Sequence, residues 1–237
     1  MPSRTLALSA ALSAALLPAL APPAAASGVH RVMVPGSYGV RDVPADAARL
    51  LAKVRGCAAQ VSRGAYREDA NGPASVRVCE KDGAVYWKAD LDVDCDGLST
   101  RRCNAATDPY FVGQTAFTQS DGRPLSAERL PFVVVPAPSA IWRHSASGVR
   151  GGGVVAVVHE DKVRYGVVGD TGPARIIGEA SYAMAESLGI DPDPRTGGAG
   201  SGVTYIFFKD SRAIPIEDRA EAARLGESLA RRFLRAD

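Results

Sequence analysis

The chain has 237 residues, of which 46% are hydrophobic and 23% charged, and its formal net charge at pH 7 is +2. This length and balance are typical of a globular protein with one good core, so one domain is expected. A chain so close to neutral has no overall field that attracts a polycation, and any such attraction must come from a local group of charges.

The first 26 residues have the features of a secretory signal peptide. Arg4 gives the positive start, 6–20 the apolar core, and Ala24 to Ala26 a cleavage site of small residues. The apolar run is too short for a membrane span, which needs about 20 residues. We therefore predict a signal peptide over 1–26, a secreted extracellular protein, and a single domain over 27–237.

Four cysteines are candidates for two disulfides in an exported chain. Of the three pairings that they allow, we favour Cys95 with Cys103, which closes a short loop, and Cys57 with Cys79. No zinc site is expected, because no two cysteines have the Cys-x-x-Cys spacing and the three histidines lie far from them in the sequence.

One helix and one hairpin are predicted in the first third of the chain. Residues 27–40 are expected to be an extended lead-in. Residues 44–54 are typical of a helix, because Pro44 suits its first turn and apolar side chains recur on one side. Residues 76–79 and 84–87 are predicted to be the two strands of a hairpin.

The second of these strands continues into an alternating acidic stretch. Because side chains alternate along a strand, Leu91, Val93 and Cys95 face one way and four aspartates the other. A row of acids on one strand face repels itself, so a bound cation would explain it better than folding stability does. The candidates for contact with a cationic ligand are Asp90, Asp92 and Asp94.

Calcium is an alternative ligand, and a solvated structural face is another. Residues 92–97 match the opening of an EF-hand loop, but its twelfth position is Cys103 instead of Glu and no helices flank it.

The second half is predicted to be mostly strands. Residues 131–136, 154–159, 163–168 and 203–208 are β-branched and aromatic, and 215–235 form an amphipathic helix. The glycine-rich residues 148 to 153 precede a strand, whereas a phosphate loop follows one, so nucleotide binding is disfavoured. The predicted fold is mainly β, a single-domain barrel with peripheral helices near both ends and a core over about 57–210, with α+β as the alternative.

Two carboxylates within 163–189 form a candidate catalytic pair. Residues 169–173 are turn residues, which places Asp170 on a bend at the end of a strand, and Glu179 falls at or just before the start of a predicted helix over 180–188. Glycoside hydrolysis needs two carboxylates that face each other. Their spacing alone favours simpler roles, in turn hydrogen bonding for Asp170 and with the helix dipole for Glu179.

Together with 86–97, the segment 163–189 resembles the family 75 glycoside hydrolases, secreted chitosanases first recognised in fungi. The essential carboxylates of that family are the Asp of Gly-Asp-Thr-Gly-Pro and the Glu of Ile-Gly-Glu-Ala-Ser, which are Asp170 and Glu179 here. The resemblance implies endo-hydrolysis of β-1,4-linked glucosamine polymers with inversion. It covers roughly residues 80–210, with supporting stretches at 108–109, 114–115, 130–136, 154–178 and 202–206.

The Asp-Thr-Gly…Ile-Gly segment also resembles a segment of murein lytic transglycosylases, and this resemblance favours a double-psi-like barrel of about six strands. We favour Glu179 as the proton donor and Asp170 as the base that activates water, and the reverse assignment stays open because the more desolvated carboxyl keeps its proton longer. No cofactor or metal, no nucleic-acid or membrane partner, and a monomer are expected. The predicted substrate contacts are Asp90, Asp92, Asp94, Trp87, Gln114, Thr171 and Tyr182.

Two other functions are open at this point. One is a barrel enzyme that cleaves peptidoglycan or cellulose, neither of which needs the acidic row. The other is a non-catalytic secreted module that binds carbohydrate or calcium.

Overall fold

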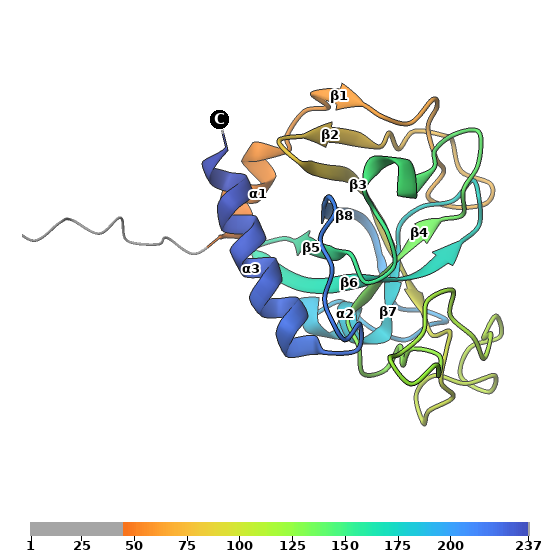
Figure 1. Cartoon of the computed structure of the whole chain (residues 1–237). Helices are drawn as coiled ribbons and strands as arrows, with labels where there is room; N and C mark the ends of the chain where they lie inside the picture. The colour runs from red at the N-terminus through yellow and green to blue at the C-terminus, as the bar shows by residue number, and fades with distance from the viewer. Residues whose placement is uncertain (1–44, 237) are drawn as a thin grey trace, which may run out of the picture. The chain divides into compact units, whose positions relative to one another are not determined.

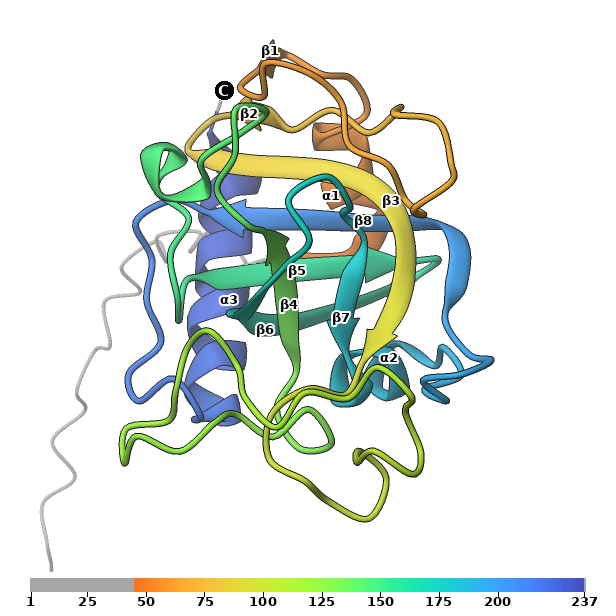
Figure 2. The same cartoon turned by 90° about the vertical axis from the view of Figure 1, so that its right-hand side faces the viewer.

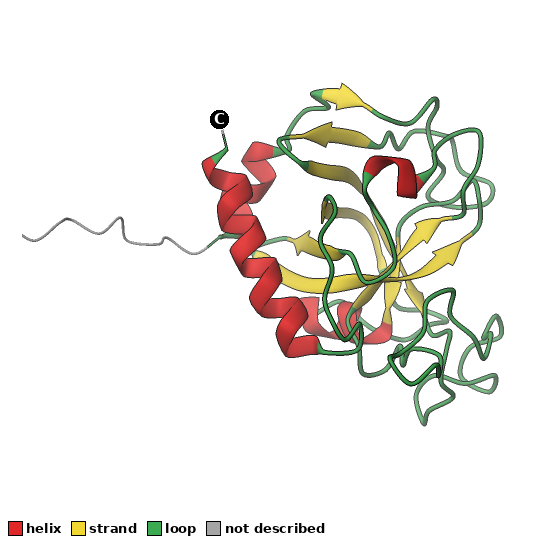
Figure 3. Ribbon diagram, in the orientation of Figure 1, coloured by secondary structure: helices red, strands yellow, loops and turns green. Residues whose placement is uncertain are grey.

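The computed structural model describes residues 45–236, so the predicted signal peptide over 1–26 and the lead-in over 27–40 lie outside the described residues. Strands dominate and the helices lie around them (Figures 1 and 3). The elements in chain order are α1 (Ala47–Lys53), β1 (Ala59–Gln60), β2 (Cys79–Lys81), β3 (Ala84–Asp94), β4 (Phe132–Pro136), a 3-10 helix (His144–Ser147), β5 (Val154–His159), β6 (Lys162–Gly172), β7 (Glu179–Ser181), α2 (Tyr182–Leu188), β8 (Ala199–Phe208) and α3 (Arg219–Arg235).

Six of the strands close into a barrel. The order is β3, β7, β4, β6, β5 and β8, and β8 pairs back onto β3. The β3–β7 and β4–β6 pairs are parallel and the other four are antiparallel. Figure 2 shows how β3 bends along the barrel wall. The prediction of a mainly β, six-stranded barrel with peripheral helices is confirmed.

Two apolar layers hold this barrel together. The inner layer joins Trp87, Tyr205 and Phe207 to valines of β4 and β5, and α2 closes it with Met184. On the outer layer, α3 packs on β5 and β6 and contributes Phe233. Because alternate strand residues serve the two layers, any polar side chain on the outer positions of an uncovered strand is available to solvent.

The predicted hairpin is present, with its first strand at Cys79–Lys81 instead of 76–79, and both favoured disulfides are confirmed. In the hairpin, Cys79 pairs with Tyr86 across β2 and β3. The bonds Cys57–Cys79 and Cys95–Cys103 are both formed. Among the described residues, no helix combines the length and the apolar character that crossing a bilayer requires.

The predicted helices at the two ends are present but shorter. Asp46 caps α1 by accepting a hydrogen bond from the backbone N–H of Arg49, so the helix begins after it. Asp218 caps α3 by accepting a hydrogen bond from the N–H of Glu221 at 2.9 Å. The helix therefore begins at Arg219, four residues after the predicted start. A carboxylate that accepts from the first-turn N–H groups fixes a helix start better than propensity does.

Two predicted boundaries near the catalytic pair are wrong. The turn expected over 169–173 is part of β6, because residues up to Gly172 pair with β4. Glu179 is not at a helix start: it begins β7, which pairs with both β3 and β4, and α2 follows only after Ser181. In both places long-range strand pairing overrides the local turn and helix signals.

Candidate active site

Asp170 and Glu179 lie on the same outer face of the barrel with one strand between them. Val134 of β4 is in register with Glu179 of β7 on one side and with Asp170 of β6 on the other. Side chains at matched positions of neighbouring strands point to the same face. Two strand spacings of about 4.8 Å place the Cα atoms of the two acids roughly 9–10 Å apart.

A bulge turns Asp170 to this face. Val133 pairs with Val168 and Val134 with Asp170, so Gly169 is an extra residue in β6 without a partner in β4. Such an insertion reverses which side of the strand the next residue faces. Glycine is required there, because a Cβ on Gly169 would lie 2.5 Å from the Phe132 ring.

The Asp170 carboxylate is buried but well supported. Its Oδ1 accepts hydrogen bonds from the backbone N–H groups of Ala116 at 2.8 Å and Thr171 at 2.7 Å. Burial raises the pKa of Asp170, and these two hydrogen bonds act in the opposite direction because they stabilise the ionised form. The site therefore favours an ionised Asp170 more than its burial alone would.

The Glu179 carboxyl has no such support. It accepts no hydrogen bond within the described part of the chain. Burial raises the pKa of Glu179 to about 7, and the charges of Asp92, Asp96 and Asp170 add to the effect. A proton on Glu179 is therefore stable near neutral pH.

Two glycines bear on where the Glu179 carboxyl lies, one across β4 in β6 and one just before Glu179 in the sequence. A Cβ on Gly172 would lie 2.6 Å from Glu179 Oε2, so this oxygen projects over β4 toward β6. On the other side, the carbonyl of Gly178 accepts the N–H of Asp92 at 2.7 Å, with a φ of +116° that favours glycine. The carboxyl of Glu179 therefore extends toward Asp170.

The acidic row of β3 borders this pair. Asp92 is in register with Glu179, and Asp94 lies two positions further along the same strand. The N–H of Asp96 donates to Asp94 Oδ1 at 2.7 Å, while the other oxygen of Asp94 is buried without a hydrogen-bond partner. Burial, followed by the charges of neighbouring acids, raises the pKa of Asp94 well above its ordinary value. The row is thus part of the same electrostatic site as the pair.

Two other acids, in β2 and in the turn that follows it, each form an ion pair with a lysine. Glu80 pairs with Lys209 at 2.7 Å, and Asp82 pairs with Lys53 at 2.7 Å. Among residues 45–236, no Lys or Arg forms an ion pair with Asp90, Asp92 or Asp94. Negative charge without a basic partner therefore gathers beside the candidate pair Asp170 and Glu179.

The segment between β3 and β4 covers one side of the site. It begins at the Cys95–Cys103 bond and brings the N–H of Ala116 to Asp170. Gln114, two residues earlier, is exposed, and Thr171 is half-buried beside Asp170. These positions agree with the predicted substrate contacts at Gln114 and Thr171, although both remain predictions.

Asp69 is a further member of the site that sequence reasoning missed. Carboxylate oxygens of Asp69, Asp90 and Asp92 all lie within 4.8 Å of one another. Asp69 belongs to a loop between Tyr66 and Val76, and no local signal connects it with residues 21 or more positions away. In the described part of the chain, Asp69, Asp90 and Asp92 are the acids close enough to one another to hold a cation. Of the 92–97 stretch considered for calcium, only Asp92 belongs to this group.

Comparison with known proteins assigns the family. The family model described as fungal chitosanase of glycosyl hydrolase group 75 matches residues 91–234, which include both catalytic candidates. The chain belongs to this family. The resemblance inferred from the motifs is confirmed.

Named relatives of this group 75 chain are fungal. It is 29% identical to endo-chitosanase B of Aspergillus oryzae over 192 residues, which cover 73% of this chain and 80% of the relative. It is 28% identical to an endo-chitosanase of Aspergillus fumigatus over 190 residues, covering 73% and 79%. Its match to endo-chitosanase C of Aspergillus oryzae is 33% identical over 138 residues, but spans 56% of this chain and only 34% of that relative.

Two aromatic substrate contacts predicted for this group 75 chain occupy packing positions. Trp87 is 2% exposed, with its ring stacked on Phe207 at 4.4 Å and on Tyr205 at 5.6 Å. The Tyr182 hydroxyl accepts a hydrogen bond from Arg102 at 2.7 Å, and the guanidinium lies over the ring. Trp87 therefore supports the barrel interior and is not placed to stack on a sugar, whereas contact of Tyr182 with a sugar stays a prediction.

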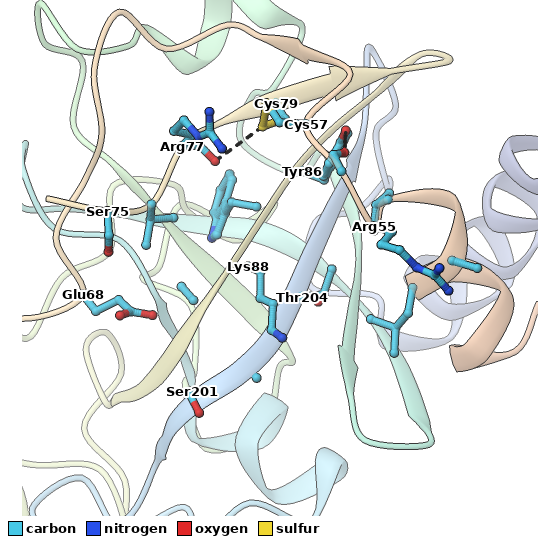
Figure 4. A pocket seen from close by; sticks show the side chains of 18 of the residues that line it. Arg55, Cys57, Glu68, Ser75, Arg77, Cys79, Tyr86, Lys88, Ser201 and Thr204 are labelled. Carbon is cyan, nitrogen blue, oxygen red and sulfur yellow. Dashed lines mark hydrogen bonds between the residues drawn. A yellow bond between two sulfur atoms is a disulfide. The ribbon is translucent and has the colours of Figure 1, made fainter.

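A cavity of about 610 Å³ lies beside the acidic row of the group 75 chain, between α1, the loop after Tyr66 and the outer side of β3 (Figure 4). Arg55, Arg77 and Lys88 line it, with Glu68 at one side. Its basic side chains make it a poor place for a cationic sugar.

Proposed function

We propose that this protein is a secreted endo-chitosanase that hydrolyses β-1,4 linkages between glucosamine units by an inverting mechanism. The observation that carries the proposal is the placement of Asp170 and Glu179 on one face with a single strand between them. Inverting enzymes hold their two carboxyl groups about 6.5–9.5 Å apart, which leaves room for a water molecule. Two strand spacings are compatible with this separation.

The environments of the two acids support distinct roles. Glu179, with its pKa raised to about 7, donates its proton to the glycosidic oxygen as the bond to the anomeric carbon breaks. Asp170, whose ionised form two N–H donors stabilise, takes a proton from the water that attacks the opposite face of that carbon. The product has the inverted configuration, and a proton exchange with solvent restores both groups.

The charge of the site supports a cationic polymer as the substrate. Asp90, Asp92 and Asp94 bring negative charge to the wall next to Glu179 without basic partners. Chitosan carries an ammonium group on each glucosamine unit, whereas cellulose is neutral. The named relatives are endo-chitosanases.

Secretion is supported by the two disulfides. Disulfides persist in oxidising compartments, and this chain has no free cysteine. Together with the predicted signal peptide over 1–26, they favour an extracellular enzyme.

The first experiment measures which polymer is cut and how. The purified protein is incubated separately with chitosan, chitin and a soluble neutral glucan, and reducing ends and anomeric configuration are followed by proton resonance. We expect short glucosamine oligomers with the inverted configuration from chitosan. Faster cleavage of the neutral glucan, or products of retained configuration, would contradict the proposal.

Amide substitutions test the pair. Asp170→Asn and Glu179→Gln should each lower kcat on chitosan at least 10³-fold, on the order of what loss of a general acid or base costs. Their melting temperatures should be equal to or above that of the parent, because Asp170→Asn removes a buried charge and Glu179→Gln keeps the side chain neutral at every pH. Asp161→Asn, at the exposed turn between β5 and β6, is the matched control and should keep full activity.

A further inference from the structure

We propose that Asp69, Asp90 and Asp92 form a subsite that binds the ammonium group of one glucosamine unit close to the cleaved linkage and thereby selects a deacetylated sugar. The inference deepens the proposed function and rests on it. Asp69 and Asp90 lie before the 91–234 segment that the family model matches.

An unsatisfied atom points to a missing ligand. Asp90 is only 5% exposed, and its Oδ1 is buried with no hydrogen-bond partner among the described residues. A buried carboxylate oxygen without a partner is costly, so such atoms are normally paired. An oxygen of the same carboxylate lies within 4.8 Å of oxygens of Asp69 and Asp92. A donor placed among the three would satisfy them together.

The charge of the cluster favours a cation as that donor. None of the three aspartates pairs with Lys or Arg within residues 45–236. Burial, followed by the charges of Asp92, Glu68 and Asp69, raises the pKa of Asp90 to about 7. A bound positive charge removes this repulsion.

An ammonium group matches the geometry. It has three N–H donors, and N–H···O distances of about 2.8 Å along tetrahedral directions place the three acceptors roughly 4.6 Å apart. The oxygens of the cluster all lie within 4.8 Å of one another, which is compatible with this spacing. An N-acetyl group has no charge and a single N–H, and its carbonyl oxygen would face carboxylates, so the same cluster disfavours an acetylated unit.

The loop that carries Asp69 is tied to the catalytic strand. The backbone of Arg67 bonds to Arg175 and Ile177, immediately before Gly178 and Glu179, and Tyr66 pairs with Val76 at the base of the loop. The carboxylate of Asp69 therefore keeps its place relative to Glu179. Asp92 is in register with Glu179, so the bound sugar lies about one strand spacing, roughly 4.8 Å, from the proton donor.

The cluster also has an exposed side through which a polymer can enter. Asp69 and Asp92 are exposed while Asp90 is buried beneath them. The neighbouring cavity is lined by Arg55, Arg77 and Lys88 (Figure 4), whose positive charges repel an ammonium group. We therefore expect a charged sugar to bind at the acidic cluster and not in that cavity.

Binding to an inactive protein tests the subsite apart from catalysis. In the Glu179→Gln background, Kd is measured by calorimetry for a glucosamine hexamer and for an N-acetylglucosamine hexamer. Asp69→Asn should weaken binding of the glucosamine hexamer about tenfold, the lower end of what a hydrogen bond to a charged group contributes. Binding of the acetylated hexamer should not change. Asp161→Asn, the same change at an exposed turn, should alter neither Kd.

Three results would overturn the inference. One is an unchanged Kd for the glucosamine hexamer in Asp69→Asn, and another is an equal loss for both hexamers. The third is calcium chloride raising the melting temperature of the parent but not of Asp69→Asn, which would assign the cluster to a divalent cation. A parent protein that binds glucosamine selectively through Asp69 yet never cleaves chitosan would reject the proposed function and retain the subsite.

Discussion

Asp170 and Glu179 have the same chemical group and differ in what surrounds it. Asp170 accepts two backbone N–H groups from Ala116 and Thr171, whereas Glu179 has acidic neighbours and no donor. Hydrogen bonds to the ionised form lower a carboxyl pKa, and burial with nearby negative charge raises it. These two backbone contacts are the difference on which the proposed assignment of Asp170 as base and Glu179 as acid rests.

The pH dependence of activity should report the proton on Glu179. An acid whose pKa is raised keeps its proton below that pKa and loses it above, so kcat/KM on soluble glucosamine oligomers should fall as pH rises through about 7. Asp92→Asn removes one of the charges that hold the value up and should move this alkaline limb to lower pH. A limb that stays in place in Asp92→Asn would contradict the electrostatic coupling.

At the scale of elements, strand register sets the distance between the two acids. The extra residue Gly169 turns Asp170 outward, and the short strand β7 inserts between β3 and β4 to place Glu179. Gly172 leaves the space into which the Glu179 carboxyl projects. The positions of the two carboxyl groups therefore depend on Gly169 and Gly172, where no Cβ fills the space.

Gly172→Ala should impair chemistry more than folding. Its added methyl would lie 2.6 Å from Glu179 Oε2 and 3.0 Å from Val134 Cγ1, so the carboxyl must move away. A displacement of about 1 Å can cost on the order of 100-fold in rate. We expect kcat to fall by that order with little change in melting temperature. An unchanged kcat would show that the carboxyl is not held in this position.

The two disulfides should differ in what their removal does. The double variant Cys95→Ala/Cys103→Ala should lower the free energy of unfolding by about 2.5 kcal/mol and reduce activity, since it frees the segment that brings Ala116 to Asp170. Cys57→Ala/Cys79→Ala should cost about 3 kcal/mol because its loop is longer, but leave kcat on chitosan nearly intact. Equal losses of activity in both variants would contradict the role of the covering segment.

At the scale of the whole molecule, a nearly neutral protein gathers several acids with raised pKa values around one site. The net charge is +2, yet burial and mutual repulsion raise the pKa of Asp90 to about 7, of Asp96 to about 6 and of Glu179 to about 7. These groups bind more protons in the folded state than in the unfolded state. Losing these protons as the pH rises costs the folded state free energy, so the acidic site lowers the stability of the fold near neutral pH.

Stability should therefore decrease as pH rises from about 4 to 7. In this window the folded state holds protons that the unfolded chain has released, so deprotonation costs the folded state. We expect the free energy of unfolding in urea to fall by on the order of 2 kcal/mol between pH 4 and pH 8, since one pKa unit corresponds to about 1.4 kcal/mol and the acids share their repulsion. Asp94→Asn should flatten this dependence, whereas Asp161→Asn should not. Constant or rising stability would contradict it.

The sequence by itself determined the features that depend on near neighbours. The alternation over 90–96, the hairpin that leads into it and the family motifs around Asp170 and Glu179 were predictable, because each depends on local periodicity, spacing or motif sequence. The cysteines allowed three pairings, and the structure contains the favoured one.

Only the tertiary structure decided how these parts meet. The local signals placed Asp170 in a turn and Glu179 at a helix start, but pairing with strands far away in the sequence put both in the barrel wall. The same folding buried Trp87 in the core and brought Asp69 to Asp90 and Asp92. The register of a closed sheet is set by its packed interior as a whole, and no single stretch of the chain contains that information.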